Sequence, residues 1–212
     1  MADTGAKFPT NNGEDYNNFT NPANAYADNE TYATSTISTS ALYHDYYDFT
    51  FGVPEGATIN GVEVKVEGYS NGELYEPYWL CALSHDGGTT YTANKGSYGT
   101  TDIRVAPEKI VTMGSSSDDW GKEDWDDTHF SNANFRVRIG HIQAYSTYTC
   151  YLDYITVKVY YTAGAEGTNT QINIGDAWKE VAGMQINIGD SWKAVAGAQV
   201  NIADTWKPIV LL

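Results

Sequence analysis

The chain has 212 residues and a formal net charge of −15, and 14% of its residues are aromatic. This length suits one full domain plus an appendage. The acidic balance argues against binding to nucleic acid or to an anionic membrane surface, because both need basic patches. It favours solubility, self-assembly without precipitation, or binding of divalent cations. No apolar run reaches the roughly 18 residues that a transmembrane helix needs, so we expect no membrane span.

The first residues contain no apolar signal core. We therefore expect synthesis in a cytoplasm without a signal peptide. Two cysteines, Cys81 and Cys150, are too few for a disulfide scaffold. We expect them to be free and buried, and the alternative is a disulfide between neighbouring strands.

Residues 1–40 are polar and rich in Asn, Thr, Ser and Ala. They predict an extended segment that packs on the following domain, with one strand at 33–38. Tyr26 and Tyr32 are expected to anchor this segment.

Residues 41–162 carry the patterns of β-strands. At 59–67, Val62, Val64 and Val66 alternate with charged residues, which predicts a strand with one buried face. The apolar run 78–83 predicts a central strand. Many short strands with turn signals between them predict an all-β, jelly-roll-like β-sandwich. Further strands are predicted at 46–51, 89–92, 103–105, 109–113, 135–139 and 155–161.

A small-residue linker at 163–170 precedes three copies of a 14-residue unit that fill 171–212: QINIGDAWKEVAGM, QINIGDSWKAVAGA and QVNIADTWKPIVLL. Each copy predicts a β-hairpin. In the first copy, Ile172 and Ile174 alternate with Asn173, which is typical of a strand, and a Gly-Asp turn signal follows. A two-residue turn would pair Trp178 with Asn173. A three-residue turn with a bulge would pair Trp178 with Ile174, and we favour this second pairing.

Three short hairpins bury little surface, so their apolar rows need a partner. The regular period favours a homo-oligomer, a trimeric stem, and the alternative is a sheet that lies on its own domain. In the first case the assembly interface comprises Ile172, Ile174, Trp178, Ile186, Ile188, Trp192, Val200, Ile202 and Trp206.

The segment 118–127 is dense in carboxylates, and calcium takes six to eight oxygen ligands. It lacks the EF-hand spacing, so a solvated acidic loop pinned by Trp120 and Trp125 is the alternative to a calcium site. The candidate ligands are Asp118, Asp119, Glu123, Asp124, Asp126 and Asp127.

No catalytic site is expected. The histidines His44, His85, His129 and His141 show no metal-ligand spacing, and Ser115 to Ser117 lack a nucleophile frame. Asp153 is in phase with buried positions, so we expect it to pair with backbone amides or with Arg136 or Arg138.

A subunit of an extracellular filament, whose hairpins exchange strands with a neighbour, is one alternative function. A carbohydrate- or receptor-binding module is another, because aromatic rings stack on the apolar faces of sugars. The alternative is that tyrosines pack across strands or at subunit contacts. The candidates are Tyr43, Tyr46, Tyr47, Tyr75, Tyr78, Tyr91 and Tyr98.

Six short stretches within residues 20–162 form a recognisable set: 21–27, 32–34, 49–64, 120–125, 134–138 and 153–161. Together they resemble a module common in tailed-bacteriophage structural proteins. The repeats are similar to hairpin repeats near the ends of phage tail and fibre proteins. The resemblance implies a non-enzymatic virion part on the virion surface: a capsid decoration, a head fibre, or a tail-fibre or tail-tip component. Implied partners are other virion proteins and a host-surface glycan.

Overall fold

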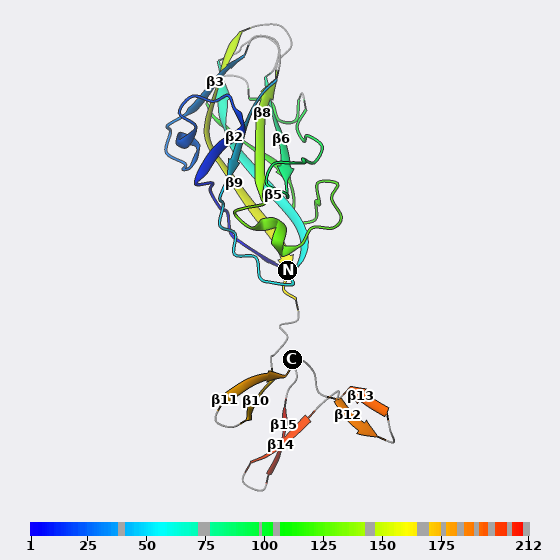
Figure 1. Ribbon diagram of the computed structural model, residues 1–212. Helices are drawn as coiled ribbons and strands as arrows, with labels where there is room; N and C mark the ends of the chain where they lie inside the picture. The colour runs from blue at the N-terminus through cyan, green and yellow to red at the C-terminus, as the bar shows by residue number, and fades with distance from the viewer. Residues whose placement is uncertain are drawn as a thin grey trace. The chain divides into compact units, whose positions relative to one another are not determined.

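The computed structural model describes residues 1–37, 41–71, 77–97, 99–103, 107–142 and 147–164, together with the backbone of strands between 170 and 209 (Figure 1). The chain divides into two compact units, Met1–Gly164 and Ala165–Leu212. We call them the body and the repeat unit. None of the described helices is long and apolar enough to cross a membrane.

The body is built from short and long strands with two 3-10 turns between them. Its elements are β1 (Ala2–Asp3), β2 (Asn11–Asn17), η1 (Pro22–Ala25), β3 (Ala33–Ile37), β4 (Leu42–Tyr47), β5 (Thr58–Ser70), β6 (Tyr78–Ser84), β7 (Lys109–Gly114), η2 (Asp127–Phe130), β8 (Arg136–Ile142) and β9 (Tyr148–Thr162).

These strands form two antiparallel sheets, and strands that follow each other in the chain belong to different sheets. One sheet has the order β1-β9-β5-β7, with β3 also paired to β9, and the other has the order β2-β4-β8-β6. The odd-numbered strands therefore form one sheet and the even-numbered strands form the other. Each connection crosses between the sheets, which makes the body a jelly-roll-like β-sandwich. The predicted fold class is confirmed.

The long strands β5 and β9 show why the chain forms sheets. Val62, Val64 and Val66 of β5 are fully buried, whereas Glu63 and Lys65 between them are half-buried. This period of two places one face on the core. The register pairs Val64 with Val157, so the apolar faces of β5 and β9 continue each other.

An aromatic cluster fills one part of the core. Phe135 contacts Phe51 with a centroid distance of 5.0 Å and Phe130 with one of 5.3 Å. Phe49 and Phe51 were expected in a strand, but β4 ends at Tyr47. Asp48, Thr50 and Gly52 adopt positive φ, which a strand does not allow. The predicted strand at 46–51 is therefore wrong beyond Tyr47.

The first 37 residues contribute more than the single strand expected from the sequence. They supply β1 and β3 to one sheet and β2 to the other. Tyr26 makes an isolated bridge to Tyr154 and packs against the core, and Tyr32 contacts Tyr69 edge-on at 5.4 Å. Both tyrosines anchor the segment as predicted.

Strand β6 is buried although it is the last strand of its sheet, not a central strand as predicted. The chain that follows β6 covers the edge, because Cys81 and Lys95 exchange backbone hydrogen bonds of 2.8 and 2.7 Å. The predicted strand at 89–92 is wrong, since these residues form a bend and loop. Most of the predicted strand at 103–105 lies outside the described residues.

The repeat unit contains three hairpins. In the first, Ile174 pairs with Ala177 and Trp178 pairs with Asn173. Two residues are left for the connection, the commonest length in hairpins. The favoured pairing of Trp178 with Ile174 is therefore wrong. The strands are β10 (Thr170–Ile174), β11 (Ala177–Val181), β12 (Gln185–Ile188), β13 (Ser191–Ala194), β14 (Ala198–Ile202) and β15 (Thr205–Ile209).

Candidate functional site

The outer face of the even-numbered sheet carries a polar and aromatic surface. His44 and Tyr46 of β4 are fully buried, so the alternating residues Tyr43, Asp45 and Tyr47 belong to the other face. The register places Asp45 directly opposite Arg138 on β8.

Asp45 and Arg138 form a bidentate ion pair at the centre of this surface. Arg138 Nε donates to Asp45 Oδ1 at 2.8 Å, and Nη2 donates to Oδ2 at 2.9 Å. The Asp45 side chain is only 2% exposed and that of Arg138 is 15% exposed. Two parallel charge-assisted bonds fix the plane of the guanidinium.

Two tyrosine rings pack on this guanidinium. Its carbon lies 3.5 Å from the centroid of Tyr91 and 4.0 Å from that of Tyr16. Both distances are typical of cation–π contacts. The Tyr91 hydroxyl also donates to Asp45 Oδ2 at 3.1 Å. Burial, with the Asp45 charge, raises the pKa of Tyr91, so this hydroxyl keeps its proton.

Tyr43 completes the surface because Gly140 leaves room for its ring. A Cβ atom at position 140 would lie 2.5 Å from Tyr43 Cδ1, far closer than packing allows. The Tyr16 and Tyr43 rings meet edge to face at 5.8 Å. Asn94 Nδ2 donates to the Tyr43 hydroxyl at 3.3 Å. The third tyrosine is therefore also held in place.

These side chains enclose a cavity of about 240 Å³, which we call the tyrosine cleft. Its polar groups include N–H groups of Arg138 that Asp45 does not use, because a guanidinium has five. The cleft thus combines apolar ring surface with fixed donors and acceptors. Its lining consists of Tyr16, Tyr43, Ala82, Tyr91, Thr92, Asn94 and Arg138.

A second cavity of about 510 Å³ shares Tyr91 and Thr92 with the cleft. We call it the histidine cavity. His85, which lines it, contacts Trp125 edge to face at 5.9 Å. Its lining is His85, Thr90, Tyr91, Thr92, Gly121, Lys122, Glu123 and Asp124.

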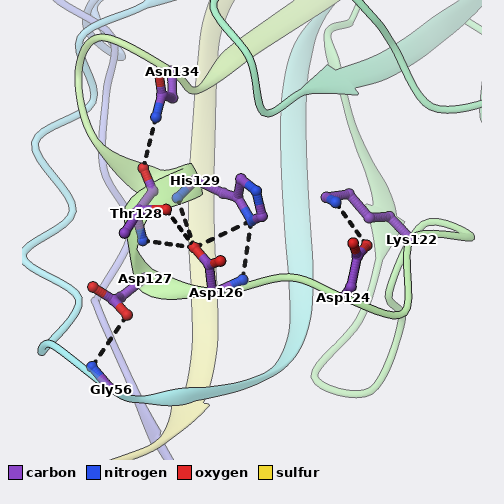
Figure 2. Close-up of polar contacts among 8 residues, drawn as sticks. All are labelled: Gly56, Lys122, Asp124, Asp126, Asp127, Thr128, His129 and Asn134. Carbon is purple, nitrogen blue, oxygen red and sulfur yellow. Dashed lines mark hydrogen bonds and ion pairs between the residues drawn. The ribbon is translucent and has the colours of Figure 1, made fainter.

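The acidic loop uses its carboxylates to fix its own backbone (Figure 2). Asp126 accepts hydrogen bonds from the backbone N–H groups of Thr128 at 2.9 Å and His129 at 3.3 Å, which caps η2. Asp127 accepts from the Gly56 amide at 3.1 Å. The hydrogen bond from the Thr128 side chain lowers the pKa of Asp126.

Three of the other four predicted calcium ligands also lie in separate contacts. Asp118 pairs with Lys95 at 2.9 Å, and Asp124 pairs with Lys122 at 2.7 Å. Asp119 accepts from the Gly121 amide at 2.8 Å. Trp120 and Trp125 are buried, as the alternative reading expected. The loop therefore has the contacts of a self-capped acidic loop, and the structure does not gather its oxygens around one point.

A different set of acids is gathered, at the outer face of the odd-numbered sheet. Ligand oxygens of Asp28, Glu67 and Asp153 lie within 4.8 Å of one another. Burial, then the nearby Asp28 and Glu108 charges, raise the pKa of Glu67. This triad offers three of the six to eight oxygens that calcium takes. The sequence analysis missed it because the three acids come from distant segments.

Asp153 is 1% exposed, and its Oδ1 accepts a hydrogen bond from the Asn29 amide at 3.4 Å. Pairing with a backbone amide was one of the two expected outcomes and is confirmed. The expected pairing of Asp153 with Arg138 is wrong, because the carboxylate partner of Arg138 is Asp45.

The histidines of β4 and β8 pack in the core of the body. His44 and His141 are fully buried and both contact Phe19, with centroid distances of 5.4 and 5.7 Å. Burial lowers the pKa of His44 to about 4 and that of His141 to about 3. Both rings are therefore neutral at physiological pH.

The predicted tyrosines lie in different environments. Tyr43 and Tyr91 line the cleft, whereas Tyr46 is fully buried and is no surface candidate. Tyr47 lies under Arg136 at 4.2 Å. Tyr78 is half-buried in β6, while Tyr75 and Tyr98 lie outside the described residues. Sequence reasoning missed Tyr16, Asn94 and the role of Arg138.

The predicted assembly residues lie on the strands of the repeat unit, but their side chains are outside what the structure describes. That interface stays a prediction. The two thiols, Cys81 and Cys150, are free and buried, as expected.

Comparisons with known proteins add little to this geometry. No protein-family model and no curated protein matches the chain. A carbohydrate-binding module, TmCBM61, solved with β-1,4-galactotriose, has 8% identity and a TM-score of 0.33, over 65% of this chain and 77% of that one. The VP2 subviral particle of infectious bursal disease virus has 6% identity and a TM-score of 0.28, over 62% of this chain and 34% of that one. Scores this low carry no conclusion about function.

Proposed function

We propose that this chain is a non-enzymatic structural and attachment protein of a tailed-phage virion, and that its body binds carbohydrate in the tyrosine cleft. The observation that supports binding is the packing of Tyr16 and Tyr91 on Arg138, beside Tyr43, around one cavity. Such a surface offers ring faces for sugar C–H groups and fixed polar groups for sugar hydroxyls.

The cleft is also pre-organised. Asp45 fixes Arg138 by two bonds, and Arg138 in turn fixes two tyrosine rings. A ligand that meets side chains already in place loses less conformational entropy on binding. This matters for sugars, because each hydroxyl must give up water before it gains a protein partner.

A glycan array probed with the purified chain tests the binding role. We expect Tyr16→Ala to weaken binding to the recognised glycans at least about tenfold, since it removes a ring from the cleft. The matched control is Tyr151→Ala, which removes a stacked ring from the other sheet, where Tyr69 lies 4.6 Å away. If Tyr151→Ala abolished binding and Tyr16→Ala did not, the sugar site would lie on the odd-numbered sheet, and the tyrosine cleft would be excluded as the site.

The virion role rests on the resemblance of residues 20–162 and of the repeats to phage structural proteins. In this role the protein is made in the host cytoplasm and displayed on the virion surface. The repeat unit joins it to two further copies, as a trimer, and to other virion proteins. The chain contributes no catalysis and needs no cofactor.

Light scattering of the full chain and of residues 1–164 tests the assembly role. We expect an oligomer for the full chain and a monomer for the body, because the repeats carry the predicted interface. A monomer for both at all concentrations would contradict self-assembly of the isolated protein and would leave the sugar test unaffected.

A further inference from the structure

We infer that the tyrosine cleft and the histidine cavity are two subsites of one groove, which takes an uncharged linear oligosaccharide. The inference rests on the proposed carbohydrate binding and names its ligand class. Its starting observation is that Tyr91 and Thr92 line both cavities. A ligand that fills one cavity therefore contacts residues that also line the other cavity.

The shared wall is rigid, so the two subsites keep a fixed spacing. The Thr92 amide donates to the Leu83 carbonyl at 2.9 Å, and the Leu83 amide donates to Thr92 Oγ1 at 3.0 Å. The neighbouring Thr90 donates through its amide and its hydroxyl to Asp86, at 2.8 and 2.7 Å. These bonds tie the wall to β6 and to the turn after it. Because the residues shared by the two cavities are held in place, the two subsites stay at a fixed distance from each other. A fixed distance suits a chain of linked sugar rings better than two separate ligands.

The charges of the groove select uncharged sugars. Each cation that lines it has a carboxylate partner: Arg138 pairs with Asp45 and Lys122 with Asp124. Glu123 adds an exposed negative charge to the histidine cavity, and the whole chain carries −15. A sialic or uronic acid would bring its carboxylate next to Glu123 and to two cations whose charges are already offset by Asp45 and Asp124, and that costs binding energy.

The sizes of the cavities indicate how the chain is divided. The tyrosine cleft, at about 240 Å³, is smaller than the usual site for a drug-sized ligand, and the histidine cavity, at about 510 Å³, lies within that range. We therefore assign the end of the sugar chain to the cleft and the following units to the histidine cavity.

The probes are linear gluco-, galacto- and manno-configured oligosaccharides of one to six units, titrated calorimetrically with the full chain. In the series that binds, affinity should rise at least tenfold from one unit to three and then level off. Sialylated or uronate-containing counterparts should bind at least tenfold more weakly.

One variant separates the subsites. Glu123→Trp changes both the volume and the aromatic content of the histidine cavity, so it should alter the affinity for three units at least tenfold and the affinity for one unit much less. Glu55→Trp is the matched control, because Glu55 is exposed and lies outside both cavities. Tyr16→Ala should weaken binding at every length.

The outcomes are distinct. Binding without dependence on length, no effect of Glu123→Trp, or preference for acidic sugars would overturn the two-subsite groove and leave sugar binding intact. Absence of binding to every probe and to a glycan array would overturn the proposed function itself.

Discussion

The body and the repeat unit use β-structure in opposite ways. In the body, strands that follow each other in the chain lie in different sheets, so each paired strand comes from a distant segment. In the repeat unit, each strand pairs with the next one, as β10 does with β11. The body therefore depends on contacts between distant residues, whereas each hairpin is formed by residues close in sequence.

This difference predicts different stabilities. Removing one strand of the body would break contacts on both sides of the sandwich, so the body should unfold as one unit. A single hairpin is marginal in water and gains stability only from neighbours. The predictions below use this contrast, and they run from the largest expected effect to the smallest.

The largest effect is expected in the aromatic core of the body. Phe135→Ala should lower the free energy of unfolding by about 4 kcal/mol, because it leaves a cavity among the rings of Phe49, Phe51 and Phe130. Urea unfolding followed by tryptophan fluorescence measures the loss. Ile110→Ala, at a residue 56% exposed, is the control and should cost under about 0.5 kcal/mol. Equal effects of the two changes would contradict a single cooperative core.

The next effect is a loss of stability of the body in mild acid. His44 and His141 are buried as neutral rings, with pKa values lowered to about 4 and about 3. In the unfolded chain they take up protons near pH 6.5, so the unfolded state binds more protons below that pH. The stabilisation is complete above pH 6.5 and falls as the pH drops towards the folded pKa values. Between pH 7.5 and 5.5 the body should lose about 3 kcal/mol.

Two controls sharpen the acid prediction. His141→Gln keeps an amide that can donate to or accept from the Tyr148 hydroxyl, which lies 3.0 Å from the imidazole Nδ1, and it should remove about half of the loss. The repeat unit contains no histidine, so residues 165–212 should show no such loss over the same pH range. A pH-independent body in urea titrations at both pH values would contradict the neutral buried state of the two rings.

A smaller effect on the body is expected from changes in the repeats. Trp192→Ala should weaken self-association in light scattering and shift the melting temperature of the body by less than about 2 °C, since the repeats form a compact unit of their own. Normal assembly together with earlier melting of the body would instead show that the repeats pack on their own domain.

The smallest effect is the reactivity of the thiols, which reports on the body alone. Cys81 and Cys150 are fully buried, and burial raises the pKa of both. In the native chain neither should react with a thiol reagent at pH 8, and both should react on unfolding. Fast labelling under native conditions would show that the body opens locally. The repeats contain no cysteine and do not contribute to the signal.

The parts of the fold that the sequence predicts well are those with a strict period. Alternating valines identify β5, and alternating apolar residues identify β8 and β9. Strand β2 was missed because its sequence, NNGEDYN, is almost entirely polar, and the bulge between Asn12 and Asn17 interrupts its register.

The candidate site was predictable only in part. Tyr43 and Tyr91 were recognised as aromatic candidates, but nothing local indicates that Arg138 meets Asp45, a residue 93 positions earlier. The sequence does contain two patterns that point to the site. Tyr43, Asp45 and Tyr47 occupy alternate positions of one strand, and two arginines occupy alternate positions of another. Combining the two requires the register between β4 and β8, which strand periodicity does not supply.

The place of β9 in the odd-numbered sheet has a consequence for how the protein is made. β9 pairs with β5 on one side and with β1 and β3 on the other, and it is the last strand of the body to be translated. Until it leaves the ribosome, β1 and β3 have no partner in their sheet. Translation at about 5–20 residues per second puts several seconds between the synthesis of β5 and that of β9. During that interval the odd-numbered sheet is incomplete, and Val64 of β5 lacks its partner Val157.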